Sequence, residues 1–279
     1  MSNFSEYSYN YFERCVNCGH TEFKQMGKGT DRTNKFHKQV VECKNCKLLF
    51  TNPIADRRSM QLYYSTYGST HPRALDISQK QIRFAKEVTE QFSNAEKCLR
   101  FLDVGAASGE IMQSFKMQGW EVYGIELSES YIQFIKEKRN LGNVYSCEIE
   151  DAPFPANNFD FINFWHVIEH LRDPIIVLKK IYSWLKPGGK VNIGTPNPTP
   201  FYLLLSSYIT AHFDLGIDHT FGFPPKVFED ILNEIGFIVK MHRVYNNPDK
   251  RYSSKKTELM RKIGLYKTMQ QIIAQKPAI

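Results

Sequence analysis

The sequence predicts a doubly wound α/β fold with a mainly parallel sheet, preceded by a small module that contains four cysteines. Apolar runs alternate with helix-like segments through the middle of the chain, which is the pattern of a parallel sheet. The first run, residues 99–104, stops at the glycine-containing turn 105–109, and a strand, a turn and a helix in this order open such a sheet. Two Cys-x-x-Cys pairs near the N-terminus indicate the separate module.

Composition limits the classes of protein to which the chain can belong. The chain has 279 residues and is 42% hydrophobic, which is enough for one large core and a small module. The longest apolar run, residues 201–205, is far shorter than the roughly 20 residues that span a bilayer. Residues 1–10 lack the basic and then apolar pattern of a signal peptide. We therefore expect a cytoplasmic protein without a transmembrane segment.

Residues 1–55 are expected to form a zinc ribbon. Cys15 and Cys18 make one Cys-x-x-Cys pair, and Cys43 and Cys46 make the other. Four thiolates in two such pairs can surround one zinc ion, with a hairpin between the pairs. A closed set of four sulfurs has no open coordination position, so the expected role of the metal is structural. Disulfide bonds are the alternative, but nothing in the sequence indicates export.

Residues 56–95 are expected to form a helical bridge between the zinc ribbon and the sheet. Apolar and aromatic residues recur at helical spacing in segments 59–67 and 77–92. Tyr63, Tyr64 and Tyr67 belong to the first of these segments, where they either pack against the domain or line the mouth of a ligand site.

The turn after the first strand predicts a site for a nucleoside cofactor. Gly105 and Gly109 lack the third glycine, three residues further on, that a dinucleotide-binding turn requires. Asp103 stands just before the turn, and Glu126 ends the next apolar strand. A carboxylate about 20 residues beyond the turn can accept two hydrogen bonds from a ribose diol.

These motifs, with those that follow, resemble the class I S-adenosylmethionine-dependent methyltransferases. The resemblance covers residues 99–196 and includes an acid after the third strand, a Phe-Asp pair, a Glu-His pair and a Lys-Pro-Gly-Gly turn. Ala107 stands where the family commonly has glycine. The resemblance implies a Rossmann-like, seven-stranded sheet with S-adenosylmethionine as cofactor. It implies these cofactor-binding residues: Asp103, Gly105, Ala106, Gly109, Glu126, Leu127, Glu148, Ile149 and His166.

Within that set, Glu148 is implied as the contact to the adenine, and a solvated loop carboxylate is the alternative. If the acceptor is a hydroxyl, a base must remove its proton, and histidine is the usual choice. The candidates are His219, His166 and His170, of which we favour His219. Glu169 with His170 and His166 also resembles a metal-binding variant of ubiquinone-pathway and small-RNA O-methyltransferases, in which a divalent ion would orient the acceptor oxygens.

The acceptor is expected to be a small molecule or a glycan. A zinc ribbon ahead of a methyltransferase domain resembles deoxysugar C-methyltransferases and bacterial proteins of surface-polysaccharide pathways. The chain ends before the further domain of those C-methyltransferases, so we expect a hydroxyl of a sugar or polysaccharide precursor. An RNA acceptor and a non-catalytic adaptor that binds S-adenosylmethionine are the alternatives. The aromatic segment 197–224 is expected to form a substrate lid or wall, or else a subunit contact.

The methyltransferase domain is expected over residues 96–247, followed by a basic C-terminal helix over residues 248–279. This tail has eight Lys or Arg residues and two acids, a net charge of +6 out of the formal +7. Its apolar residues recur near a 3.6-residue period and so predict an amphipathic helix. They are Leu259, Ile263, Tyr266, Met269 and Ile273. We expect this helix to pack on the domain or on a second subunit of a homodimer, with an anionic membrane surface or RNA as alternatives.

Overall fold

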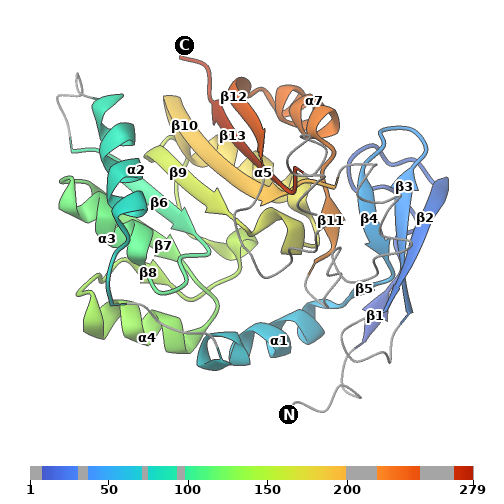
Figure 1. Cartoon of the computed structure of the whole chain (residues 1–279), viewed down its shortest axis with the longest axis horizontal. Coiled ribbons are helices and arrows are strands. Elements are labelled where there is room, and N and C mark those ends of the chain that lie inside the picture. The colour runs from blue at the N-terminus through green and yellow to red at the C-terminus, as the bar shows by residue number, and fades with distance from the viewer. Residues whose placement is uncertain are drawn as a thin grey trace, which may run out of the picture.

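Seven strands form the central sheet of the protein, in the order β12-β13-β10-β9-β6-β7-β8 (Figure 1). The structure is a computed structural model that describes residues 8–30, 37–70, 75–92, 98–198, 219–245 and 267–278. The strands are β6 (Arg100–Val104), β7 (Glu121–Ile125), β8 (Val144–Tyr145), β9 (Phe159–Trp165), β10 (Leu185–Pro196), β12 (Ile238–Tyr245) and β13 (Met269–Gln275). Strands β6 to β10 pair in parallel, whereas β13 is antiparallel to both β10 and β12. The predicted Rossmann-like, mainly parallel sheet is confirmed.

Helices cover both faces of this sheet and make two apolar cores. One face carries α2 (Gln79–Glu90), α3 (Glu110–Met117) and α4 (Glu129–Lys138), and the other carries α5 (Pro174–Trp184) and α7 (Pro225–Ile235). On the first face, the ring of Phe101 from β6 stacks on Phe115 of α3 with centroids 3.8 Å apart. The core is rich in buried aromatic residues, which contribute large apolar areas to its stability. Among the described residues, no helix is long and apolar enough to cross a membrane.

The cysteine module is a second, antiparallel sheet with the strand order β11-β4-β3-β2. Its strands are β2 (Phe23–Thr30), β3 (His37–Cys43), β4 (Leu49–Asn52) and β11 (Phe221–Gly222). Strands β2 and β3 are the hairpin expected between the two cysteine pairs. Strand β11 comes from far along the chain, and Cys43 and Phe50 belong to the same apolar core as Phe164 of β9. The module is therefore packed on the main sheet.

Helix α1 (Arg57–Thr70) connects the cysteine module to the main sheet. It follows β5 (Ile54–Ala55), which pairs with β1 (Tyr9–Asn10), and it runs along the lower edge of the molecule toward α4 (Figure 1). Two helices, α1 and α2, thus occupy the predicted bridge.

The predicted C-terminal helix is wrong where the structure describes the tail. Met269 and Ile273, expected on that helix, lie in β13, which fills the gap between β10 and β12. Alternate residues of this strand, such as Gln270 and Ile272, are fully buried, which is the period of a strand. The helical spacing was misleading because residues 269–275 pair with a strand on each side, and such pairing decides the conformation of a short segment. The other apolar residues of the pattern, Leu259, Ile263 and Tyr266, lie outside the described residues.

The expected lid is also wrong at the two aromatic residues of segment 197–224 that are described. Phe221 and Phe223 are 4% and 0% exposed and belong to the apolar core between the module and the sheet. The Phe221 ring lies 6.0 Å from that of Phe50 in β4. The remaining aromatic residues of the segment, Phe201, Tyr202, Tyr208 and Phe213, lie outside the described residues.

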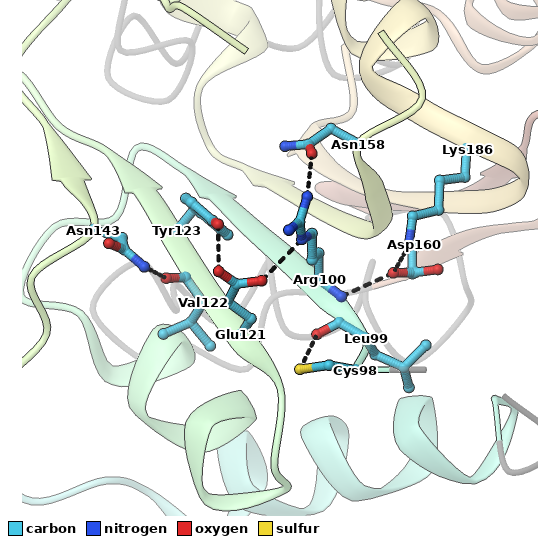
Figure 2. A network of polar contacts seen from close by, with 10 residues as sticks. All are labelled: Cys98, Leu99, Arg100, Glu121, Val122, Tyr123, Asn143, Asn158, Asp160 and Lys186. Atoms are coloured by element: carbon cyan, nitrogen blue, oxygen red, sulfur yellow. Dashed lines mark hydrogen bonds and ion pairs between the residues drawn. The ribbon is translucent and has the colours of Figure 1, made fainter. Parts of the chain in front are cut away.

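A polar network closes the edge of the sheet at the amino ends of its parallel strands (Figure 2). Asp160 accepts hydrogen bonds from the backbone N–H of Arg100 at 2.8 Å and from Lys186 Nζ at 2.6 Å. The Arg100 guanidinium donates to Glu121 at 2.8 Å and to Asn158 at 2.7 Å. These contacts link four strands at one edge, so the opposite edge, at the carboxyl ends, is the one available for a ligand.

Candidate functional site

A cavity of about 480 Å³ opens at the carboxyl ends of β6, β7 and β9. Open α/β sheets bind their ligands at this edge, beside the strand where the order reverses. The residues of the predicted cofactor site that line the cavity are Gly105, Glu126, Leu127, Glu148, Ile149 and His166. Ala107 of the turn, which was not in the predicted set, lines it as well. The predicted catalytic residue His170 also lines it. Asp103, Ala106, Gly109 and His219 are not among the described residues that line it.

The turn between β6 and α3 forms the floor of the cavity. Gly105 has φ +75°, and a Cβ atom there would lie 2.6 Å from Val167 Cγ2, so this position requires glycine. Ala107 has φ +45°, which explains why glycine is common at this position in the proteins that the sequence resembles. His166, on the opposite wall, also has a positive φ, of +55°. Such strained backbone positions persist only where the surrounding structure holds them, and they are concentrated at functional sites.

Glu126 is held tightly beside this turn. One carboxylate oxygen accepts the backbone N–H of Ala107, and the other accepts those of Leu127 and Ser128, all at 2.8 Å. Burial raises the pKa of Glu126, while these three backbone hydrogen bonds act against that shift. The carboxylate is therefore fixed at the end of β7.

Asp103 lies beneath the turn rather than in the cavity. It is 4% exposed, and its Oδ1 accepts a hydrogen bond from Asn163 Nδ2 at 2.8 Å. Burial raises the pKa of Asp103 to about 7, and the negative charges of Glu110 and Glu126 add to this, whereas the Asn163 hydrogen bond acts against it. The acid before the turn is thus poised between its two protonation states near neutral pH.

Helix α1 forms one wall of the cavity. The sequence indicated this only as one of two possible roles for the tyrosines of this segment, which was to line the mouth of a ligand site. Arg57 Nε lies 2.9 Å from the Glu148 carboxylate, and its Nη2 donates to Asp151 at 2.8 Å. Gln61 Nε2 donates to Glu148 at 2.6 Å. Glu148 is therefore bound by two residues of α1. Tyr64 lines the cavity beside them.

One acid and three histidines form a cluster of which His166 and His170 line the cavity. Glu169 is 1% exposed and accepts hydrogen bonds from His166 Nδ1 and Thr195 Oγ1, both at 3.0 Å. Burial acts to raise the pKa of Glu169, but the hydrogen bond from His166 and the charges of His170 and His219 outweigh it and lower the pKa to about 2. The His170 and His219 rings lie 4.6 Å apart. The sequence grouped His166 and His170 with Glu169, and the fold adds His219 to this group.

That cluster also offers a set of metal-ligating atoms. One such atom from each of Glu169, His170 and His219 lies within 4.8 Å of the others. Imidazole and carboxylate donors suit zinc, iron or manganese. The donor set therefore fits a divalent cation, with the carboxylate already ionised.

The four predicted cysteines also come together. The Sγ atoms of Cys15 and Cys46 lie 3.5 Å apart, those of Cys18 and Cys43 lie 3.6 Å apart, and no disulfide joins them. In each pair the residue after the second cysteine has a positive φ, +72° at Gly19 and +64° at Lys47, and its N–H bonds the first cysteine's carbonyl. Two matched turns with four converging sulfurs fit a zinc site.

Comparisons with known proteins agree with this geometry. A family model described as "Methyltransferase domain" matches residues 77–240. A ubiquinone biosynthesis O-methyltransferase of Acinetobacter baumannii is 27% identical over 166 residues, which are 55% of this chain and 70% of that protein. The enzyme with the same name from Coxiella burnetii is 31% identical over 133 residues, 46% of this chain and 54% of that protein.

Solved structures share the fold. A SAM-dependent methyltransferase from Archaeoglobus fulgidus superposes with a TM-score of 0.51 at 23% identity, covering 70% of this chain and 94% of that one. The [4+2]-cyclase SpnF superposes with a TM-score of 0.53 at 16% identity, covering 78% and 95%. Since a cyclase shares the architecture, these likenesses support the fold, and the activity has to be argued from the site.

The raised pKa of Asp103 predicts a pH-dependent stability. Its pKa rises from the usual 3.8 to about 7 on folding, so the folded state holds this proton more tightly. The resulting stabilisation is complete below pH 3.8 and is lost as the pH rises through about 7. We expect Asp103→Asn, which cannot ionise, to gain stability relative to the wild type by as much as about 4 kcal/mol between pH 4 and pH 8.

Urea unfolding of the two proteins at both pH values measures this difference, with Asp230→Asn on the surface of α7 as the control. A difference between Asp103→Asn and wild type that stays the same at both pH values would show that folding does not alter the ionisation of Asp103.

Proposed function

The chain belongs to the family of methyltransferase domains whose model spans residues 77–240, and from this premise we propose that it transfers a methyl group to a hydroxyl of a small acceptor. The chain is an S-adenosylmethionine-dependent methyltransferase. One observation carries the proposal: Glu126, His166 and His170 line a single cavity at the carboxyl edge of the sheet. When bound, S-adenosylmethionine supplies a methyl group activated by its sulfonium. An in-line transfer of that group needs mainly accurate positioning of the acceptor.

The residues around the cavity fit this cofactor. Gly105 is required at the turn because a Cβ atom there would collide with Val167, and both residues line the cavity. We propose that Glu126 binds the ribose hydroxyls and that Leu127 and Ile149 give the adenine its apolar contacts. Arg57 and Gln61 hold Glu148, and we propose that its carboxylate accepts a hydrogen bond from the adenine amino group. Asp103, Ala106 and Gly109 act from behind the cavity. Ala106 and Gly109 shape the turn, and Asp103 supplies a carboxyl group beneath it.

Activation of the acceptor hydroxyl is the second part of the proposal. His166 lines the cavity, and its Nδ1 bonds the buried, ionised Glu169 at 3.0 Å. With Nδ1–H donating to the carboxylate, Nε2 is the nitrogen that can take a proton. This geometry supports His166 as the base. His219, which the sequence favoured, packs against His170 one ring further from the cavity.

A divalent cation at Glu169, His170 and His219 is the competing means of activation. These residues would hold the ion, which would supply Lewis acidity to the acceptor oxygen. In that arrangement His170, which lines the cavity, connects the ion to the acceptor side.

The acceptor class follows from two lines of support. The zinc module ahead of the domain supports a sugar or polysaccharide precursor, as the sequence predicts. The relatives are named ubiquinone biosynthesis O-methyltransferases, which supports oxygen as the methylated atom and makes a phenol the competing acceptor. The division into residues 1–55, 56–95, 96–247 and 248–279, with zinc held by Cys15, Cys18, Cys43 and Cys46, is part of the same proposal.

The first prediction concerns the cofactor. Glu126→Ala should weaken the binding of S-adenosylhomocysteine by about 2–3 kcal/mol, because hydrogen bonds to a charged group are lost. Titration calorimetry measures it, and Glu87→Ala on the exposed face of α2 is the matched control. Unchanged affinity would remove Glu126 from the site, and tighter binding of NAD than of S-adenosylhomocysteine would contradict the cofactor class.

The second prediction concerns the acceptor. In an assay of methyl transfer to a panel of sugar nucleotides and polyprenylated phenols, His166→Gln should lower kcat by about 10²–10⁴ and leave the affinity for S-adenosylhomocysteine unchanged. Activity that a chelator abolishes and a divalent cation restores would assign activation to the metal cluster instead. Full activity of His166→Gln without sensitivity to chelators would contradict both arrangements.

The third prediction concerns the zinc module. Elemental analysis should find one zinc per chain, and Cys15→Ser should lose it together with the hydrogen-exchange protection of β2, β3 and β4. Because α1 follows the module directly, the affinity for S-adenosylhomocysteine should fall as well. Cys98→Ser, at an exposed cysteine outside the module, is the matched control. A metal-free wild type with a fully protected module would show that zinc is not required.

A further inference from the structure

Five side chains from five adjacent strands form one row of hydrogen bonds across the sheet. Strands β12, β13, β10, β9 and β6 lie side by side in this order (Figure 1). The row runs from Arg243 through Gln271, Asn192 and Asn163 to Asp103. Its four donor–acceptor distances, from the Arg243 end, are 2.7, 2.7, 2.8 and 2.8 Å. One end is an exposed cation at the sheet edge, and the other is the buried acid beneath the cofactor cavity.

The inner part of the row lies in an apolar layer. Asp103, Asn163 and Asn192 are 4%, 5% and 2% exposed. Two residues earlier on the same face of β6 and β9 stand Phe101 and Phe161, which are fully buried. Burying amides among aromatic rings is unfavourable unless every polar group finds a partner. The row supplies those partners. Apolar side chains at these positions would need no partners, so the polar row is explained by what it does for Asp103.

The four hydrogen bonds of the row all point toward Asp103, which accepts the last of them. Asn163 Nδ2 donates to Asp103, Asn192 Nδ2 to Asn163, and Gln271 Nε2 to Asn192. Arg243 sets this direction because a guanidinium has donors and no acceptor, so Gln271 must turn its oxygen toward it. If the amides were reversed, Asn163 would present its oxygen to Asp103. Only a protonated Asp103 could satisfy that oxygen.

We propose that Arg243 is a positioning residue that acts through Gln271, Asn192 and Asn163 to hold Asp103 in its ionised form. The consequence for binding rests on the proposed function. An ionised carboxylate beneath the cavity favours the binding of S-adenosylmethionine, whose sulfonium and ammonium groups are positively charged. The row opposes burial and the negative charges of Glu110 on α3 and Glu126 after β7, which favour protonation of Asp103.

The effect requires the row rather than the charge of Arg243 alone. Four strand spacings of about 4.8 Å separate Arg243 from Asp103, roughly 19 Å in all. Because Arg243 is exposed to solvent and the span is long, direct attraction between the two charges is weak. The orientation of the three amides carries the influence of Arg243 across the sheet.

Carbon-13 NMR of protein labelled at the aspartate carboxyls tests the proposal without any cofactor. The Asp103 resonance is assigned by its loss in Asp103→Asn. In Arg243→Met we expect its titration midpoint to rise by about one pH unit relative to the wild type, because the amides are free to reverse. Arg243→Lys, which keeps a donor without an acceptor, should stay close to the wild type. Lys240→Met removes a charge from the same exposed strand outside the row and should leave the midpoint unchanged.

A second variant, Gln271→Met, and a second measurement, the pH dependence of S-adenosylhomocysteine binding, test the same proposal. Gln271→Met interrupts the row one strand closer to Asp103 and should give the same rise as Arg243→Met. The pH below which S-adenosylhomocysteine binding weakens should move upward in both variants by the same amount as the NMR midpoint. An unchanged midpoint in Arg243→Met and Gln271→Met would overturn the proposal, as would an equal rise in Lys240→Met. Failure of the wild type to bind S-adenosylhomocysteine would instead refute the proposed function, since the NMR titration does not depend on it.

Discussion

The turn that follows β6 is the constraint on which the functional edge of the molecule depends. Its first two amides, of Gly105 and Ala106, both donate to the carbonyl of Ile125 at the end of β7, and the Glu126 carboxylate holds the next one, of Ala107. Val167 closes on Gly105 from the β9 side so tightly that no side chain fits there. The turn therefore locks the carboxyl ends of three strands together, and the cavity takes its floor and two of its walls from that arrangement.

The cysteine module packs against the main sheet and contributes to this site through helix α1. It shares an apolar core with the main sheet, and β11 from the second half of the chain pairs with its strand β4. The module delivers α1 to the cavity, where Arg57 and Gln61 bind Glu148. Helix α1 thereby links the module that contains the four cysteines to the part of the cavity where Glu148 lies.

Two buried acids lie near the cavity, and in each case polar side chains bond the carboxylate. Glu169 stays ionised because histidines and Thr195 surround it. Asp103 is held less firmly, since burial and two neighbouring carboxylates oppose the single amide that bonds it. Such groups are costly in an apolar layer, and their place beside the cavity gives a physical reason for retaining them.

The sequence by itself determined the parallel strands, the glycine turn, the acid at Glu126 and the two cysteine pairs, because each is a local pattern whose chemistry depends on neighbours along the chain. Only the tertiary structure decided that Met269–Gln275 is a strand, that Phe221 and Phe223 are core residues, and that α1 lines the cavity. It also decided that Asp103 lies behind the cavity and that Arg243 reaches it through three amides. These features are pairings between segments far apart in sequence, and the conformation of a short segment with a partner on each side follows from those partners rather than from its own periodicity.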